Sequence, residues 1–190
     1  GAMATPGDAG IFGASTRVAW TLQLVVFALV SALAPMAARL HAANDLAGLQ
    51  RAIGATSRLV FVLCLIAAVV LLFAGEWILS WFGAEFRSGY ISMSVLLAGQ
   101  LAWAANAPAG VILNMSGRHN ASAALLGIAV VFDILLSAIL IPSMGALGAA
   151  IANTATIVLW NISSAAGVYH WLGIRSWVWF KDHQPRVAAT

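Results

Sequence analysis

Long stretches without a charged residue are the feature that most constrains this chain. Four of them contain no Asp, Glu, Lys or Arg, and a fifth contains only Asp133. The uncharged stretches are residues 18–38, 59–75, 88–117 and 143–174, and the fifth is residues 120–142. Each is long enough to cross the hydrocarbon core of a bilayer, which takes about 20 helical residues, with a range of roughly 17 to 25.

This pattern predicts an all-α membrane protein, because a helix satisfies its own backbone hydrogen bonds in lipid. About five transmembrane helices fit the chain. Their predicted ranges are 17–38, 57–75, 89–114, 120–141 and 146–171, which together make a transmembrane bundle over residues 17–172.

Composition supports lipid as the main solvent. The 190 residues are 62% hydrophobic and 8% charged, whereas soluble domains carry about 25% charged residues. The nine Lys and Arg residues lie mainly in the connections between the predicted helices rather than in one patch. Because the basic residues form no single patch, we expect no nucleic-acid partner. The expected partner of the apolar surface is the lipid bilayer.

The predicted connections differ in character. Residues 39–58 are polar and read as a short amphipathic helix on the membrane surface, capped by Asn44 or Asp45. Residues 75–88 read as an interfacial turn, and residues 115–120 and 142–145 as tight turns.

The distribution of Lys and Arg sets an orientation. With residues 39–58 in the cytoplasm, most of the basic residues fall on the cytoplasmic side, as the positive-inside rule requires. We therefore expect an inner-membrane protein of several spans with a cytoplasmic C-terminal tail at 173–190. Five spans then place the N-terminal loop 1–16 outside, and we expect missing helices to precede it, so that the chain is a fragment of a larger protein.

Enzyme signatures are absent from the sequence. The chain contains no Cys/His metal spacing, no His-Glu-x-x-His and no Gly-x-Ser-x-Gly. We expect no enzyme activity, no catalytic residue, no metal site and no cofactor.

Polar residues inside the predicted spans are the better candidates, since each is costly in lipid and should face protein or cavity water. Gln100, Trp103 and Asn114 share one helical face of the third span. Asp133 lies near the middle of the fourth span, and Asn153 lies in the fifth. The alternative use of such groups is hydrogen bonding between helices, and for Trp103 it is core packing.

Arg17 opens the first span. Its planar guanidinium suits an anionic head group such as a pyrophosphate. The alternative is that its side chain snorkels to the lipid head groups.

Several motifs occur in a familiar order. They are Gly10–Arg17 (GIFGASTR), Ala34–Asp45 (APMAARLHAAND), Phe82–Phe86 (FGAEF), Leu113–Arg118 (LNMSGR) and Ile141–Ala150 (IPSMGALGAA). Together they resemble the C-terminal half of polysaccharide-biosynthesis flippases of the multidrug/oligosaccharidyl-lipid/polysaccharide exporter superfamily. Phe12 stands where these proteins usually have Tyr.

The resemblance implies two pseudo-symmetric lobes around a central cavity that works by alternating access. The chain would form most of the second lobe, with a missing N-terminal lobe as partner. The implied substrate is an undecaprenyl-pyrophosphate-linked oligosaccharide, moved across the cytoplasmic membrane for polysaccharide biosynthesis. Cationic side chains often receive the pyrophosphate in such proteins.

Three other interpretations stay open at this stage. One is a multidrug/cation antiporter of the same superfamily. Another is a membrane scaffold that transports nothing. The last is a truncated, inactive lobe.

Overall fold

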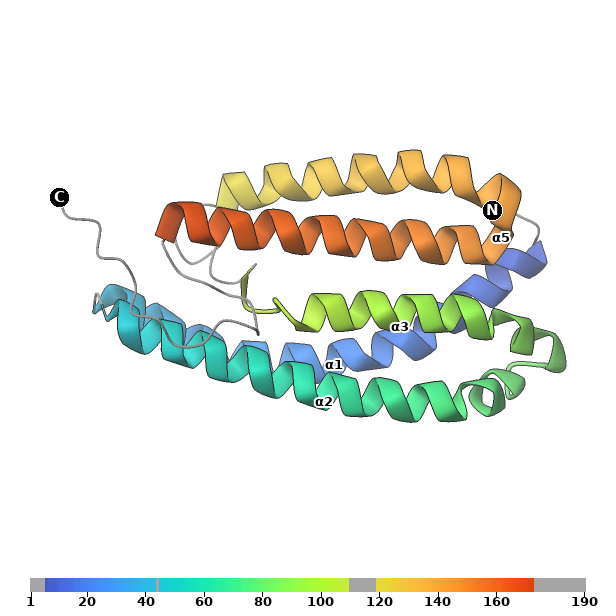
Figure 1. Ribbon diagram of the computed structural model, residues 1–190, viewed down its shortest axis with the longest axis horizontal. Helices are drawn as coiled ribbons and strands as arrows, with labels where there is room; N and C mark the ends of the chain where they lie inside the picture. Colours follow the sequence, from blue (N-terminus) through green and yellow to red (C-terminus); the bar gives the residue numbers. More distant parts are fainter. Residues whose placement is uncertain (1–5, 44, 110–118, 173–190) are drawn as a thin grey trace.

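The computed structural model describes residues 6–43, 45–109 and 119–172. These residues form long helices and no strand (Figure 1). The elements in order are α1 (Pro6–Ala42), α2 (Leu46–Ser80), the 3-10 helix η1 (Ala84–Gly89), α3 (Tyr90–Ala104) and α5 (His119–Leu172).

Helix α5 is folded back on itself. Its backbone leaves the helical conformation at Gly145, where φ is +53° and ψ is −128°. The residues before and after this point run antiparallel, as Figure 1 shows. We call residues 119–144 the first arm of α5 and residues 146–172 the second arm.

Helix α3 lies at the centre of the bundle. In Figure 1 it runs between the α5 hairpin on one side and α1 with α2 on the other, and it contacts all three helices. Successive elements cross the molecule in opposite directions. One end of the bundle therefore carries Pro6, η1 and Gly145, and the other carries the α1–α2 connection and the two ends of α5 (Figure 1).

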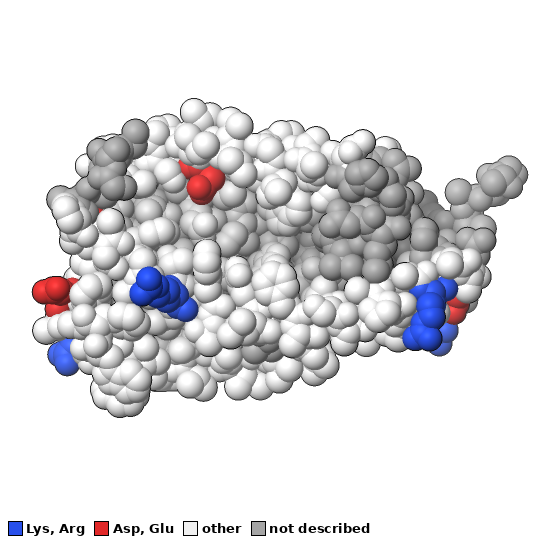
Figure 2. Space-filling view, turned by 180° about the vertical axis from the view of Figure 1, so that it is seen from behind, with Lys and Arg blue, Asp and Glu red and all other residues white. Residues whose placement is uncertain are grey.

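The surface shows that lipid surrounds this bundle. Phe73 is 90% exposed and Ile139 is 70% exposed, although both lie within long apolar helices. In Figure 2 the charged side chains on the visible face lie mostly at the two ends, with a wide uncharged band between them. Such a band is expected of a membrane protein, because apolar side chains in that position face hydrocarbon rather than water.

Among the described residues, three helices are long and apolar enough to cross a membrane, over Pro6–Leu40, Ala47–Ser80 and Asn120–His170. The last of these contains both arms of α5 and so supplies two antiparallel crossings. Helix α3 has 15 residues, slightly fewer than the roughly 17 that a full crossing takes. The expected third span, 89–114, contains α3, and its residues 110–114 lie outside the described part of the chain.

The expected loop over residues 1–16 is wrong from residue 6 onward. Helix α1 begins at Pro6 and runs without interruption through the first expected span. Proline suits the first turn of a helix, because the N–H that it lacks would have no partner there. Asp8 in the same turn stabilises the positive end of the helix dipole.

The expected surface helix over 39–58 is also corrected. Asp45 caps a helix as predicted, accepting a hydrogen bond of 2.8 Å from the Gly48 N–H. That helix continues as α2 to Ser80, so it is one element with the second span. Its apolar residues Leu49 and Ile53 are buried against α1 in a cluster of the protein interior instead of facing head groups.

The hairpin of α5 depends on glycine at its turn. A Cβ atom at Gly148 would collide with the backbone carbonyl oxygen of Leu140 in the first arm. At Gly127, in the same arm as Leu140, a Cβ atom would meet nothing within 4 Å. Replacing each glycine with Ala therefore distinguishes the effect of close packing on stability, at Gly148, from the effect of helix propensity, at Gly127.

We expect Gly148→Ala to lower the midpoint temperature of unfolding in detergent, because overpacking against backbone costs about 1–3 kcal/mol. Gly127→Ala is the matched control and should leave the midpoint unchanged or raise it slightly, since Ala favours a helix over Gly by up to about 1 kcal/mol. Equal midpoints for the two variants would contradict the close approach of the two arms.

Candidate functional site: a cavity between α1, α3 and α5

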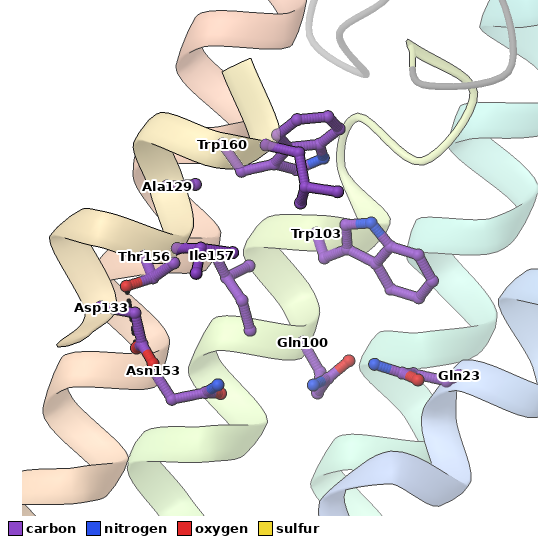
Figure 3. A pocket seen from close by; sticks show the side chains of 11 residues that line it. Gln23, Gln100, Trp103, Ala129, Asp133, Asn153, Thr156, Ile157 and Trp160 are labelled. Atoms are coloured by element: carbon purple, nitrogen blue, oxygen red, sulfur yellow. Dashed lines mark hydrogen bonds between the residues drawn. The ribbon is translucent and has the colours of Figure 1, made fainter. Parts of the chain in front are cut away.

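A cavity of about 290 Å³ lies between α1, α3 and both arms of α5 (Figure 3). One part of its wall is apolar and is supplied by both arms of the hairpin. The rest is polar or aromatic and comes from all three helices. The polar and aromatic lining residues are Gln23, Gln100, Trp103, Asp133, Asn153, Thr156 and Trp160.

Four of the six predicted site residues meet in this cavity. They are Gln100, Trp103, Asp133 and Asn153. Arg17 does not line the cavity but lies exposed on α1, six residues before Gln23. Asn114 lies outside the described residues.

Asp133 projects from the first arm toward the second. Its Oδ1 atom accepts a hydrogen bond of 3.0 Å from the Thr156 hydroxyl, drawn as a dashed line in Figure 3. Asp133 is the charged member of the lining, and no Lys or Arg of the described residues joins it there. The hydrogen bond ties the two arms together and offsets part of the cost of placing a carboxylate at this depth.

Gln100 is the least satisfied polar group of the site. Its side chain is 1% exposed, and neither its Nε2 nor its Oε1 atom has a hydrogen-bond partner. The Oδ1 atom of Asn153 is buried without a partner as well. A buried donor or acceptor without a partner costs about 1–3 kcal/mol, so these amides are unusual in a well-packed interface.

Other polar groups of α3, of the turn after it and of the second arm have hydrogen-bond partners. The Thr154 hydroxyl donates to the Val95 carbonyl over 3.0 Å, next to Gly99, where a Cβ atom would lie 2.9 Å from the Thr154 hydroxyl oxygen. Further along, Asn106 Nδ2 donates to the Asn161 carbonyl over 3.0 Å. These bonds hold α3 and the turn after it against the second arm. They use the side chains of Thr154 and Asn106 in the way that helix packing in membranes commonly does.

Trp103 stands at the edge of the cavity toward α1. Its ring packs edge-on against Phe27, with ring centroids 5.9 Å apart and an interplanar angle of 66°. Such a contact fixes the orientation of an indole. Trp160 faces the same space from the second arm (Figure 3).

Sequence reasoning missed two important residues. Gln23 lines the cavity, and Asn106 fastens α3 to the second arm. Both are amides inside uncharged stretches, so the rule that selected Gln100 could have selected them too. Neither shares a helical face with a second strongly polar residue in the sequence, which is why they did not stand out.

The described residues bring no three His, Cys, Asp or Glu side chains together in a set that could hold a metal ion. The chemistry of the cavity is that of hydrogen bonding and aromatic contact. The cavity is the candidate site of this bundle, and Asp133 is the carboxylate of its lining.

Polar groups inside membrane-spanning helices often mark the path of a transported substrate. The MatE family model matches residues 9–139, more than half of the chain. The chain therefore belongs to the MatE family, a family of membrane transporters in the multidrug/oligosaccharidyl-lipid/polysaccharide exporter superfamily. No curated protein and no solved structure matches the chain significantly.

We expect the effect of each substitution at Asp133 to depend on whether the new side chain can still accept the hydrogen bond from Thr156. Asp133→Leu removes the acceptor and should reduce folded yield or transport, while Asp133→Asn keeps an acceptor and should be milder. Thr156→Val should cost about 1.5–3 kcal/mol, the usual worth of a hydrogen bond to a charged group. Folded yield by size-exclusion chromatography and thermal unfolding measure these effects.

The control is Thr21→Val, since the Thr21 hydroxyl donates to the Arg17 carbonyl of its own helix on an exposed face. It should match the unmodified protein. Unchanged folding and transport in both Asp133 variants would contradict a role for the carboxylate in pairing and in transport alike.

Proposed function

We propose that this transporter is a flippase that moves an undecaprenyl-pyrophosphate-linked oligosaccharide across the cytoplasmic membrane for polysaccharide biosynthesis. Membership of the MatE family supplies the transporter class. The motifs around Leu113–Arg118 and Ile141–Ala150 resemble the polysaccharide branch of the superfamily and favour this substrate.

The observation that carries the proposal is the lining of the cavity. Three amides, a carboxylate and two indoles face one space. Sugar hydroxyls both donate and accept hydrogen bonds, which amides and carboxylates complement. The faces of a sugar ring carry C–H groups that pack on an indole. A site of mostly apolar wall with a few placed polar groups is typical of small-molecule recognition.

The pyrophosphate needs a different place, because no Lys or Arg of the described chain lines this cavity. We assign it to Arg17, which lies six residues from Gln23 on the same helix, a rise of about 9 Å. The guanidinium stays charged and offers several donors in one plane, which suits phosphate oxygens. Snorkelling to lipid head groups is the competing role of Arg17.

The proposed architecture is the second lobe of a two-lobe transporter. The cavity would then be shared with a first lobe across the transport pathway. The end of the bundle with Arg39, Arg51 and Arg58 would face the cytoplasm, as would the C-terminal tail.

A multidrug/cation antiporter is the second candidate. Asp133 is the charged group of the lining, and a carboxylate with nearby indoles also suits an organic cation. The two functions differ in the substrate that the protein moves, so one assay with two substrates separates them.

The assay uses lipid vesicles that contain the protein expressed from its whole natural gene. We expect a lipid-linked oligosaccharide to move to the opposite leaflet, where a lectin can bind its sugar. Trp103→Leu should slow this movement roughly two- to twelvefold, because an aromatic contact is worth about 0.5–1.5 kcal/mol. Trp77→Leu is the matched control at an exposed position outside the cavity and should be neutral.

Ethidium transport in the same vesicles is the competing readout. Ethidium movement without lipid movement would overturn the flippase and support the antiporter.

A further inference from the structure

We infer that Gln100 and Gln23 form a subsite for the acetamido group of an N-acetylated sugar in the transported lipid. The inference rests on the proposed flippase function and adds the chemical class of the sugar. It starts from a buried group that the bundle itself leaves unsatisfied.

The bundle leaves Gln100 without a partner. On the second arm Thr156 bonds to Asp133 and Thr154 bonds to Val95, while Asn153 lines the same cavity with its own Oδ1 atom unpaired. The Gln100 amide therefore keeps one donor group and one acceptor free, at the wall of a cavity. An apolar side chain of similar volume would avoid the cost, which means that folding gives no reason for an amide here.

Gln23 supplies a second amide opposite the first. Figure 3 shows the two amide groups turned toward one another, Gln23 from α1 and Gln100 from α3. The described structure records no hydrogen bond between them. A planar group placed beside both would meet a carbonyl that accepts and an NH₂ that donates on each side.

An acetamido group is the sugar substituent that matches this arrangement. It carries one N–H and one C=O that point to opposite sides of the same planar unit. Its N–H can therefore donate to the Gln100 Oε1 atom while its C=O accepts from the NH₂ group of Gln23. A hydroxyl group offers its donor and acceptor at a single atom. The methyl group of the acetamido unit needs an apolar surface, and the indole of Trp103 lines the same cavity.

The test compares two lipids that differ only at this group. The probes are polyprenyl pyrophosphate carrying N-acetylglucosamine and the same lipid carrying glucose, assayed in vesicles with the protein as its native gene encodes it. We expect faster transport of the N-acetylglucosamine lipid, because a site built for a hydrogen-bonding group rejects an analogue without it. Gln100→Met should lower that transport about tenfold, as the loss of a hydrogen bond would, and should lower transport of the glucose lipid much less, so that the preference between the two lipids is lost.

Thermal unfolding is the second readout. Gln100→Met should keep or raise the midpoint temperature, since it removes an unpaired amide while conserving volume. Gln50→Met makes the same chemical change on α2, away from the cavity, and should keep the preference for the N-acetylglucosamine lipid.

Three results would overturn the inference while leaving the flippase intact. They are equal transport of the two lipids by the unmodified protein, an equal loss for both lipids in Gln100→Met, and a lowered midpoint in that variant. Transport of neither lipid would overturn the inference and the proposed function together.

Discussion

The packing of α3 against the second arm of α5 is the contact on which the rest of the bundle depends. Helix α3 contacts α1, α2 and α5, as α1 also contacts each of the other long helices, and its contact with α5 joins the hairpin to the rest of the bundle. Gly99 allows the approach, Thr154 bonds across it to the Val95 carbonyl, and Asn106 fastens the far end to Asn161. In lipid there is no hydrophobic force between apolar helices, so close packing and such hydrogen bonds decide which helices meet.

This contact also creates the site. Between the Thr154 bond and the Asn106 bond, α3 presents Gln100 and Trp103 to the α5 hairpin, and the cavity opens there. The bundle accepts unpaired amides at this point although it satisfies Thr154 and Asn106 on either side. Buried polar groups without partners in a native interior need an explanation. In a transporter, a bound substrate that supplies the missing partners is such an explanation.

Much of the fold could be predicted from the sequence. The uncharged stretches place the apolar helices, because the cost of a charge in hydrocarbon is large and local. Gly145 marks the turn of the hairpin, because a positive φ favours glycine. The start of α1 at Pro6 was missed, because a stretch rich in Gly and Ala gives no hydrophobic period to follow. The burial of Leu49 and Ile53 was missed, because an amphipathic face looks the same whether it meets lipid or protein.

The site could be predicted only in part. Gln100, Trp103, Asp133 and Asn153 were found by one rule, the cost of polar groups in a membrane span. That rule cannot say which polar groups find partners. The side chains of Thr154 and Asn106 bond across to a neighbouring helix, while Gln100 and Asn153 keep free atoms, and the difference arises from the rotation of each helix about its axis. Gln23 lines the site because α1 packs beside α3 near Gln100. The sequence alone does not show this contact between helices.

The most direct test of the account is to ask whether the sugar of the proposed substrate occupies this cavity. A lipid-linked oligosaccharide with a photoreactive group on its sugar would be activated in membranes during transport, and the labelled peptides identified by mass spectrometry. The account predicts labels on the α3 segment with Gln100 and Trp103 and on the second arm from Asn153 to Trp160. Labels confined to the lipid-facing side of α5, around the exposed Leu135 and Ile139, would contradict it.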